Sequence, residues 1–151
     1  MDKEDIEVGV VISFICRKIN SYIKNGKIRE IKRKYSSKSK LKGCGRPFVC
    51  IGHHAGRSQW AEITTIYNQD RLEIDVNWRT WQMTGDNCCQ SQQWKNRCQY
   101  INGAVFEGAD YMWPSLSNDL ASPGCYRMIT ADGITAIRAK LAPELQSPLF
   151  D

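Results

Sequence analysis

The stretch Gly45-Arg46-Pro47-Phe48-Val49-Cys50-Ile51-Gly52 decides the fold class, together with Gln59-Trp60-Ala61-Glu62-Ile63-Thr64-Thr65-Ile66, which follows it after a short polar turn. Each is an apolar run of strand length, rich in β-branched and aromatic residues and bounded by glycine, proline or polar residues. We therefore predict two strands, over residues 46–52 and 59–66.

Three further strands are predicted from the rest of the chain. One covers residues 5–16, which are rich in Val and Ile, and another covers 71–77, where charged and apolar residues alternate. The third covers 99–106. Several short strands with turn residues between them are typical of a mainly β domain.

The last predicted element is an amphipathic helix over residues 131–141. Thr130 is a good N-cap, Gly133 is a weak point in the first turn, and Pro143 ends the helix. The whole pattern predicts a mainly β fold with a C-terminal helix, closed into a small β-barrel that forms a single domain over residues 1–151.

The positive charge is concentrated near the N-terminus. The chain carries a net charge of +5, yet residues 17–42 hold eleven basic residues and one acidic residue, Glu30, so the remainder is acidic. Such a concentration exceeds what solubility requires and is typical of a phosphate-binding surface, since each Lys or Arg that neutralises a phosphate releases counterions. We expect nucleic-acid contact here; an acidic partner protein fits the same charge.

Residues 17–43 are interpreted as a basic insertion in the barrel. The Asn25-Gly26 pair is typical of a type I′ hairpin turn, so the segment is predicted to project as a basic β-ribbon. A helix broken at Gly26 is the alternative, because Ile28, Ile31 and Tyr35 also fit helical spacing.

Composition favours a globular protein of the cytoplasm. The longest apolar stretch, residues 8–15, is shorter than the ~20 residues that cross a bilayer, and it follows acidic residues where a secretory signal carries positive charge. The seven cysteines, an odd number, favour reduced thiols. They lack the Cys-x₂-Cys pair that recurs in structural zinc sites, so no bound metal is expected.

The order of these pieces resembles the MazF/PemK toxins. The resemblance is carried by Asp5-Ile6 opening one strand, Gly45-Arg46-Pro47-Phe48-Val49 opening the next, and Ala61-Glu62-Ile63-Thr64-Thr65 closing the third. The terminal Ile129-Thr130-Ala131-Asp132-Gly133-Ile134, which runs into a helix, is also similar to the end of that family. The resemblance implies an SH3-like barrel, cleavage of RNA without a cofactor, a homodimer and neutralisation by a cognate antitoxin protein.

The resemblance also implies roles for individual residues. Arg46 matches the arginine that acts in the family, and Thr64 matches its conserved threonine, which would hydrogen-bond the scissile phosphate; the adjacent Thr65 is a substitute for it. Metal-independent cleavage needs the 2′-hydroxyl aligned for attack, charge stabilisation on the phosphorane and proton transfers. Arg46 suits the phosphate because its guanidinium is a rigid, permanently charged fork. If the two strands are antiparallel neighbours, both side chains reach one phosphate.

Acid–base candidates follow the strand predicted over residues 99–106. They are Glu107 and Asp110, at a place where some family members carry an Arg or Asp, although no arginine stands at the matching place here. His53 and His54 are interpreted as turn residues, because neighbouring side chains on a regular strand point to opposite faces.

RNA contacts are predicted for basic residues of the insertion and for two tryptophans in a predicted loop, which are suited to stacking on bases. They are Lys24, Lys27, Arg29, Lys32, Arg33, Lys34, Trp78 and Trp81. The main hypothesis is a toxin-type endoribonuclease that cleaves single-stranded RNA by attack of the 2′-hydroxyl. The alternatives are a non-catalytic nucleic-acid-binding barrel and a phage- or plasmid-borne interaction protein that has lost the activity.

Overall fold

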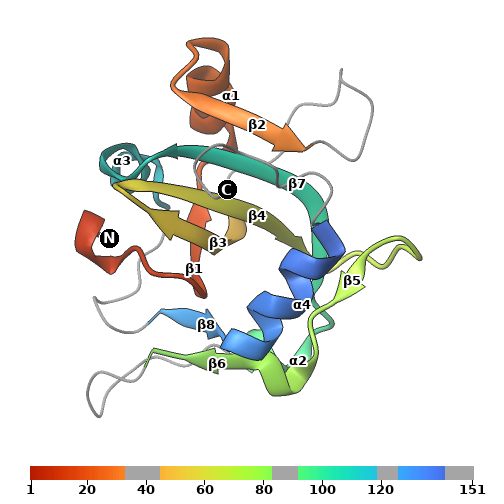
Figure 1. The fold of residues 1–151 in the computed structure, drawn as a ribbon. Helices are drawn as coiled ribbons and strands as arrows, with labels where there is room; N and C mark the ends of the chain where they lie inside the picture. Colours follow the sequence, from red (N-terminus) through yellow and green to blue (C-terminus); the bar gives the residue numbers. More distant parts are fainter. Residues whose placement is uncertain (33–44, 83–91, 119–125, 142–151) are drawn as a thin grey trace.

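An antiparallel β-sheet is the framework of the computed structural model, which describes residues 1–32, 45–82, 92–118 and 126–141. The sheet runs from β2 at one edge to β6 at the other (Figure 1). In order across it, the strands are β2 (Ile28–Lys32), β7 (Tyr100–Ala109), β4 (Arg57–Thr64), β3 (Arg46–His54), β1 (Val10–Phe14), β8 (Arg127–Ile129) and β6 (Arg79–Trp81). The short β5 (Leu72–Glu73) pairs with β7.

The central strands β3 and β4 are buried on both faces, which explains why they read as nearly continuous apolar runs. Side chains alternate between the faces of a strand. Phe48 therefore packs with Phe14, Trp60 and Trp113 in one core cluster, whereas Val49 belongs to a second cluster on the other face. The aromatic cluster includes an edge-to-face contact of Phe14 on Trp60, with ring centroids 4.9 Å apart.

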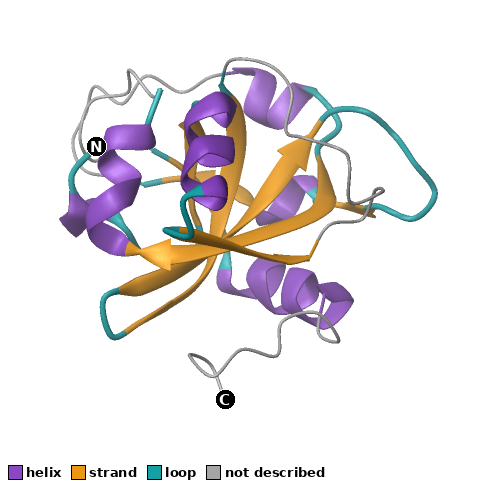
Figure 2. Cartoon of the chain, turned by 90° about the horizontal axis from the view of Figure 1, so that it is seen from above, coloured by secondary structure: helices purple, strands orange, loops and turns teal. Residues whose placement is uncertain are grey.

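Helices lie around the strands (Figure 2). The longest, α4 (Ala131–Leu141), places Ile134 and Ile137 in the second cluster and donates from Arg138 Nη1 to the carbonyl of Ile51 at 2.8 Å. The other helical segments are α1 (Cys16–Lys24), α2 (Gln92–Asn96), α3 (Trp113–Leu116) and the 3₁₀ turns η1 (Lys3–Asp5), η2 (Val76–Trp78) and η3 (Asp110–Met112).

The mainly β class with a C-terminal helix is confirmed. The helix occupies the predicted residues 131–141, and its start is capped by Thr130, whose side chain accepts from the N–H of Gly133 at 3.3 Å. Among the described residues the sheet has two open edges and does not close into a barrel.

Two predicted strands are shorter than expected. Only residues 10–14 of the segment 5–16 form a strand, since η1 precedes them and α1 begins at Cys16. The segment 71–77 pairs only at β5, because Asp75 caps η2 by accepting from the N–H of Asn77 at 2.8 Å and so ends the extended backbone.

The prediction of a basic β-ribbon with a hairpin turn at Asn25-Gly26 is wrong. Asn25 and Gly26 end a helix rather than joining two strands of a hairpin: Asn25 is the C-cap of α1, and Gly26 follows with φ of 76°. The helix forms because Cys16 and Ile19, spaced for one helical face, are both buried. The helical alternative was therefore right before Gly26 and wrong after it, where Ile28 and Ile31 lie in strand β2. Strand β2 then pairs with β7, while Arg33, Lys34 and the rest of the insertion to residue 43 lie outside the described residues.

No helix in the described parts of the chain is both long enough and apolar enough to cross a membrane.

Candidate functional site

Arg46 and Thr64 lie at the same end of the β3–β4 pair. The two strands are antiparallel neighbours, with Phe48 opposite Glu62. Arg46 stands two residues before Phe48 at the start of β3, and Thr64 stands two residues after Glu62 at the end of β4. The antiparallel arrangement on which the sequence argument depends is therefore present, and Arg46 and Thr64 share this end of the sheet.

Glu62 is a carboxyl group at this end that the sequence analysis did not select. It is only 4% exposed. Burial raises the pKa of Glu62, while the charge of Arg46 and a hydrogen bond with the side chain of Asn102 lower it in part. Because Glu62 faces Phe48 across the strands, and Arg46 is two residues from Phe48, the carboxyl group and the guanidinium belong to the same face of the sheet.

The two threonines differ in accessibility. Thr64 is 6% exposed, and its Oγ1 accepts from the backbone N–H of Ile66 at 3.2 Å, so this side chain helps to shape the turn that follows β4. Thr65, which follows the strand, is exposed. Of the pair, Thr65 has the hydroxyl that a ligand reaches from solvent.

Glu107 and Asp110 are placed at the opposite end of the sheet from Arg46. Strand β7 runs antiparallel to β4, so that Tyr100 is opposite Thr64 and Ala109 is opposite Arg57. The seven residue steps from Arg57 to Thr64 correspond to roughly 23 Å of extended strand. Glu107 and Asp110 therefore do not share a phosphate with Arg46.

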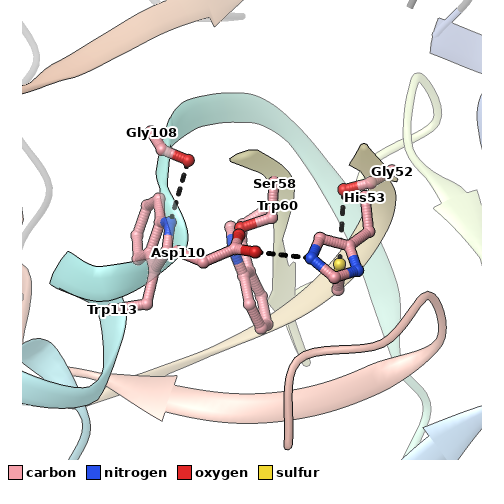
Figure 3. A network of polar contacts seen from close by, with 8 residues as sticks. Gly52, His53, Ser58, Trp60, Gly108, Asp110 and Trp113 are labelled. Carbon is pink, nitrogen blue, oxygen red and sulfur yellow. Dashed lines mark hydrogen bonds and ion pairs between the residues drawn. The ribbon is translucent and has the colours of Figure 1, made fainter. Parts of the chain in front are cut away.

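Asp110 instead pairs with His53. Its Oδ2 lies 2.5 Å from His53 Nε2, and Figure 3 shows the imidazole directed at the carboxylate. Asp110 is almost fully buried, whereas a third of the His53 side chain is exposed. The prediction that His53 and His54 are turn residues is wrong, because both belong to β3. Asp110 orients the ring of His53, whereas His54 is exposed.

Cys50 lies close to this pair. Its thiol is fully buried and donates to the carbonyl of Gly52 at 3.4 Å. Burial raises the pKa of Cys50 to about 12, with a smaller contribution from the charge of Asp110. The thiol is therefore protonated at neutral pH and is a poor nucleophile.

Glu107 is the centre of an ion-pair group. Its Oε2 lies 3.0 Å from Arg29 Nη2 and 3.9 Å from Arg57 Nη2, and its Oε1 accepts from Gln59 Nε2 at 3.1 Å. Both oxygens of the Glu107 carboxylate thus have partners on neighbouring strands, so this side chain links β2, β7 and β4.

The remaining RNA-binding candidates are spread over several elements. Lys24 ends α1 and is exposed, Lys27 lies with its Nζ 5.3 Å from the ring centroid of Tyr22, and Lys32 is the last residue of β2. Trp78 and Trp81 are half-buried and pack against the second core cluster, so they support the fold as well as offering an edge to solvent.

Metal ligands do not gather in the parts of the chain that the structure describes: no group of three or more His, Cys, Asp or Glu side chains there is placed to hold an ion. Of the cysteines within these parts, Cys16 and Cys50 are buried and Cys98 is exposed.

The sequence held one usable signal for Glu62 and none for the His53–Asp110 pair. Glu62 interrupts the apolar run of residues 60–63, and a charged residue inside a strand buried on both faces is uncommon enough to select it. His53 and Asp110 are separated by 57 residues, and only the sheet brings them together.

Comparison with known proteins adds no relative: no family model, no curated protein and no solved structure matches this chain.

Proposed function

We propose that this chain is a metal-independent endoribonuclease that cleaves single-stranded RNA, with Arg46 at the scissile phosphate. The observation that supports this best is the meeting of Arg46 and Thr64 at one end of two antiparallel strands, with the buried Glu62 on the same face. A permanent cation, a hydroxyl group and a carboxyl group are the side-chain types that phosphodiester cleavage by an internal nucleophile uses.

In the proposed reaction the 2′-hydroxyl attacks the adjacent phosphorus. Glu62 accepts the proton of the 2′-hydroxyl, the new bond from the 2′-oxygen to phosphorus forms, and the bond from phosphorus to the 5′-oxygen breaks. The leaving 5′-oxygen takes a proton from water, and a 2′,3′-cyclic phosphate remains. Burial favours Glu62 as the base, because a carboxyl group with a raised pKa binds a proton more readily near neutral pH.

Arg46 stabilises the negative charge that develops on the phosphorane, since its fork contacts two phosphate oxygens at once. Thr65 holds an oxygen of the same phosphate from the solvent side, and Thr64 shapes the turn that presents it.

The wider parts of the proposal follow the resemblance in the sequence. They are a MazF/PemK-like toxin with an SH3-like arrangement of strands in an open sheet, a homodimer, a cognate antitoxin partner and a location in the cytoplasm. The order of the strands around Arg46 and Thr64, followed by the C-terminal helix, supports the likeness of the fold. The homodimer, the antitoxin and the location follow from the resemblance alone.

The experiment is a single-turnover assay on a labelled single-stranded RNA in EDTA. Arg46→Ala is expected to slow cleavage by about 10²- to 10³-fold, the usual effect of removing one donor to a developing anion. Arg46→Lys keeps the positive charge but lacks the guanidinium fork, so its cleavage rate is expected to lie between those of wild type and Arg46→Ala. An Arg97→Ala control removes an exposed arginine from another part of the molecule and should cleave like wild type. Equal rates for wild type and Arg46→Ala would contradict the proposal.

The second candidate is a nucleic-acid-binding protein without catalysis. It is favoured by the half-exposed Arg29 and Arg57 beside Glu107, which suit phosphate contact far from Arg46. RNA binding with salt dependence, but no cleavage by the wild type under any condition, would favour it.

A further inference from the structure

Glu107 organises one row of side chains across three strands. Arg29 on β2 stands opposite Glu107 on β7, and Glu107 stands opposite Gln59 on β4. Residues opposite each other in antiparallel strands point to the same face. Figure 1 shows the three strands side by side, with β7 between β2 and β4.

Arg57 joins this row from the same strand as Gln59. It lies two residues before Gln59, so its side chain emerges on the same face, and its Nη2 lies 3.9 Å from Glu107 Oε2. The Arg57 side chain is 43% exposed and that of Arg29 is 52% exposed, whereas the Glu107 side chain is only 4% exposed. The buried carboxylate of Glu107 thus lies beside two half-exposed guanidinium groups, those of Arg29 and Arg57.

This arrangement exceeds what the buried carboxylate requires. The guanidinium of Arg29 at 3.0 Å and the amide of Gln59 at 3.1 Å already give Glu107 an ion pair and a hydrogen bond. A second guanidinium at the limit of ion-pair distance adds little to stability when it is half exposed. The three charges leave a net charge of +1, and each guanidinium carries five donors.

Residues at both ends of β2 are also positively charged. Lys27, next to the start of β2, is exposed, and Lys32 ends the strand. Strand β2, which supplies one end of the row, thus carries or adjoins three basic residues of the segment 17–42: Lys27, Arg29 and Lys32.

We propose that Arg29 and Arg57, held by the buried Glu107, form a phosphate-binding site for the backbone of single-stranded RNA, distinct from the Arg46 end of the sheet. Glu107 is then a positioning residue for two arginines, in place of the acid or base that the sequence suggested. The inference rests on the proposed function in that its ligand is RNA, but it requires no cleavage. A guanidinium fork fixed by a carboxylate is preorganised for phosphate oxygens, so little rotamer entropy is lost on binding.

The test is the salt dependence of binding of a labelled 12-nucleotide RNA, with every protein in the Arg46→Ala background so that the probe stays intact. The main variant is Arg29→Gln with Arg57→Gln and Glu107→Gln, which removes the buried charge together with its partners and lowers the net charge by one. Arg97→Gln, at an exposed position outside the basic segment 17–42, lowers the net charge by the same amount and is the matched control. If two phosphate contacts are lost, the slope of log K against log salt should become shallower by about 1.4 in the triple variant, and it should stay unchanged in the control.

A single Arg57→Gln variant keeps the Arg29–Glu107 pair and is expected to change the slope by about 0.7. If thermal melting shows that the triple variant does not fold, the Arg57→Gln variant is sufficient for the test. Equal changes of slope in the triple variant and the control would mean that only the overall charge matters, which would overturn the proposal. Unchanged binding by both would overturn it as well, and would point to an acidic protein as the partner of this surface.

The two proposals fail separately. Binding that depends on Arg29 and Arg57, without cleavage by the wild type, would remove the nuclease and leave this site. Cleavage that depends on Arg46, with an unchanged salt slope in the variants, would leave the nuclease and remove this site.

Discussion

Burial raises the pKa of Glu62, and the charge of Arg46 on the facing strand β3 offsets part of that effect. The two groups are linked by the pairing of β3 with β4, which sets Glu62 opposite Phe48, two residues from Arg46. Glu62 is therefore a carboxyl group whose ionisation is costly in the folded protein, at the end of the sheet where the proposed chemistry takes place.

Glu62→Gln should make the protein more stable at neutral pH. A carboxyl group with a raised pKa in the folded state binds more protons folded than unfolded, so its contribution to stability is lost as pH rises from its ordinary pKa of 4.5 through the folded pKa. The variant should have a higher melting temperature than wild type at pH 8, with a smaller difference at pH 5. A gain of about 1 kcal/mol would raise the melting temperature of a domain of this size by roughly 2–4 °C. A variant that melts below wild type at pH 8 would contradict this account.

Glu62→Gln should also slow RNA cleavage, by about 10²- to 10⁴-fold if Glu62 is the general base. The measurement is the single-turnover rate from pH 5 to 9. The wild-type rate should fall on the acidic side as Glu62 becomes protonated, and the variant should lose this limb. Glu107→Gln is the comparison, because Glu107 is paired with arginines at the far end of the sheet and should leave the limb in place. If the acidic limb disappears in Glu107→Gln and persists in Glu62→Gln, Glu107 rather than Glu62 is the general base.

Cys50 and Cys98 should differ sharply in reactivity. Burial raises the pKa of the Cys50 thiol to about 12, whereas Cys98 is exposed. Iodoacetamide at pH 8, followed by peptide mass mapping, should label Cys98 within minutes and leave Cys50 unmodified until the protein unfolds. Rapid labelling of Cys50 in the native protein would show that the strand pair around it opens.

Gly133→Ala should destabilise the protein, although Ala favours a helix over Gly by about 1 kcal/mol. A Cβ at this position would lie 2.5 Å from Ile129 Cγ2 and 2.8 Å from Trp78 Cβ, so α4 would have to move away from the sheet. Overpacking of this kind costs about 1–3 kcal/mol. Thermal unfolding monitored by circular dichroism should give a lower melting temperature, and a higher one would mean that the helix shifts freely.

Elements whose sequence pattern agrees with their burial were predictable. β3, β4 and α4 follow directly from apolar runs and from a capped amphipathic stretch, because both faces of the central strands are buried and Thr130 caps the helix. The position of Arg46 relative to Thr64 followed from the same runs once antiparallel pairing was assumed.

The errors came from local signals that tertiary packing overrode. Asn25-Gly26 suits a hairpin turn, but the burial of Cys16 and Ile19 favours a helix before it, and the pair serves as its end. Glu107 was predicted as an acid or base after a strand, yet Arg29 and Arg57 pair with it from two other strands. Contacts between residues 50 to 80 positions apart, such as these, leave no trace in a single sequence.

The most direct test of the central claim is the chemical nature of the ends that cleavage leaves. RNA cut by the wild-type protein in EDTA should carry a 2′,3′-cyclic phosphate on one fragment and a 5′-hydroxyl on the other, as resolved by mass spectrometry. An RNA with a single 2′-deoxy substitution at the cut position should remain intact there, and Arg46→Ala should give the same ends far more slowly. Fragments with a 3′-hydroxyl and a 5′-phosphate, or cleavage of the 2′-deoxy RNA at that position, would contradict attack by the internal hydroxyl group and with it the site built around Arg46.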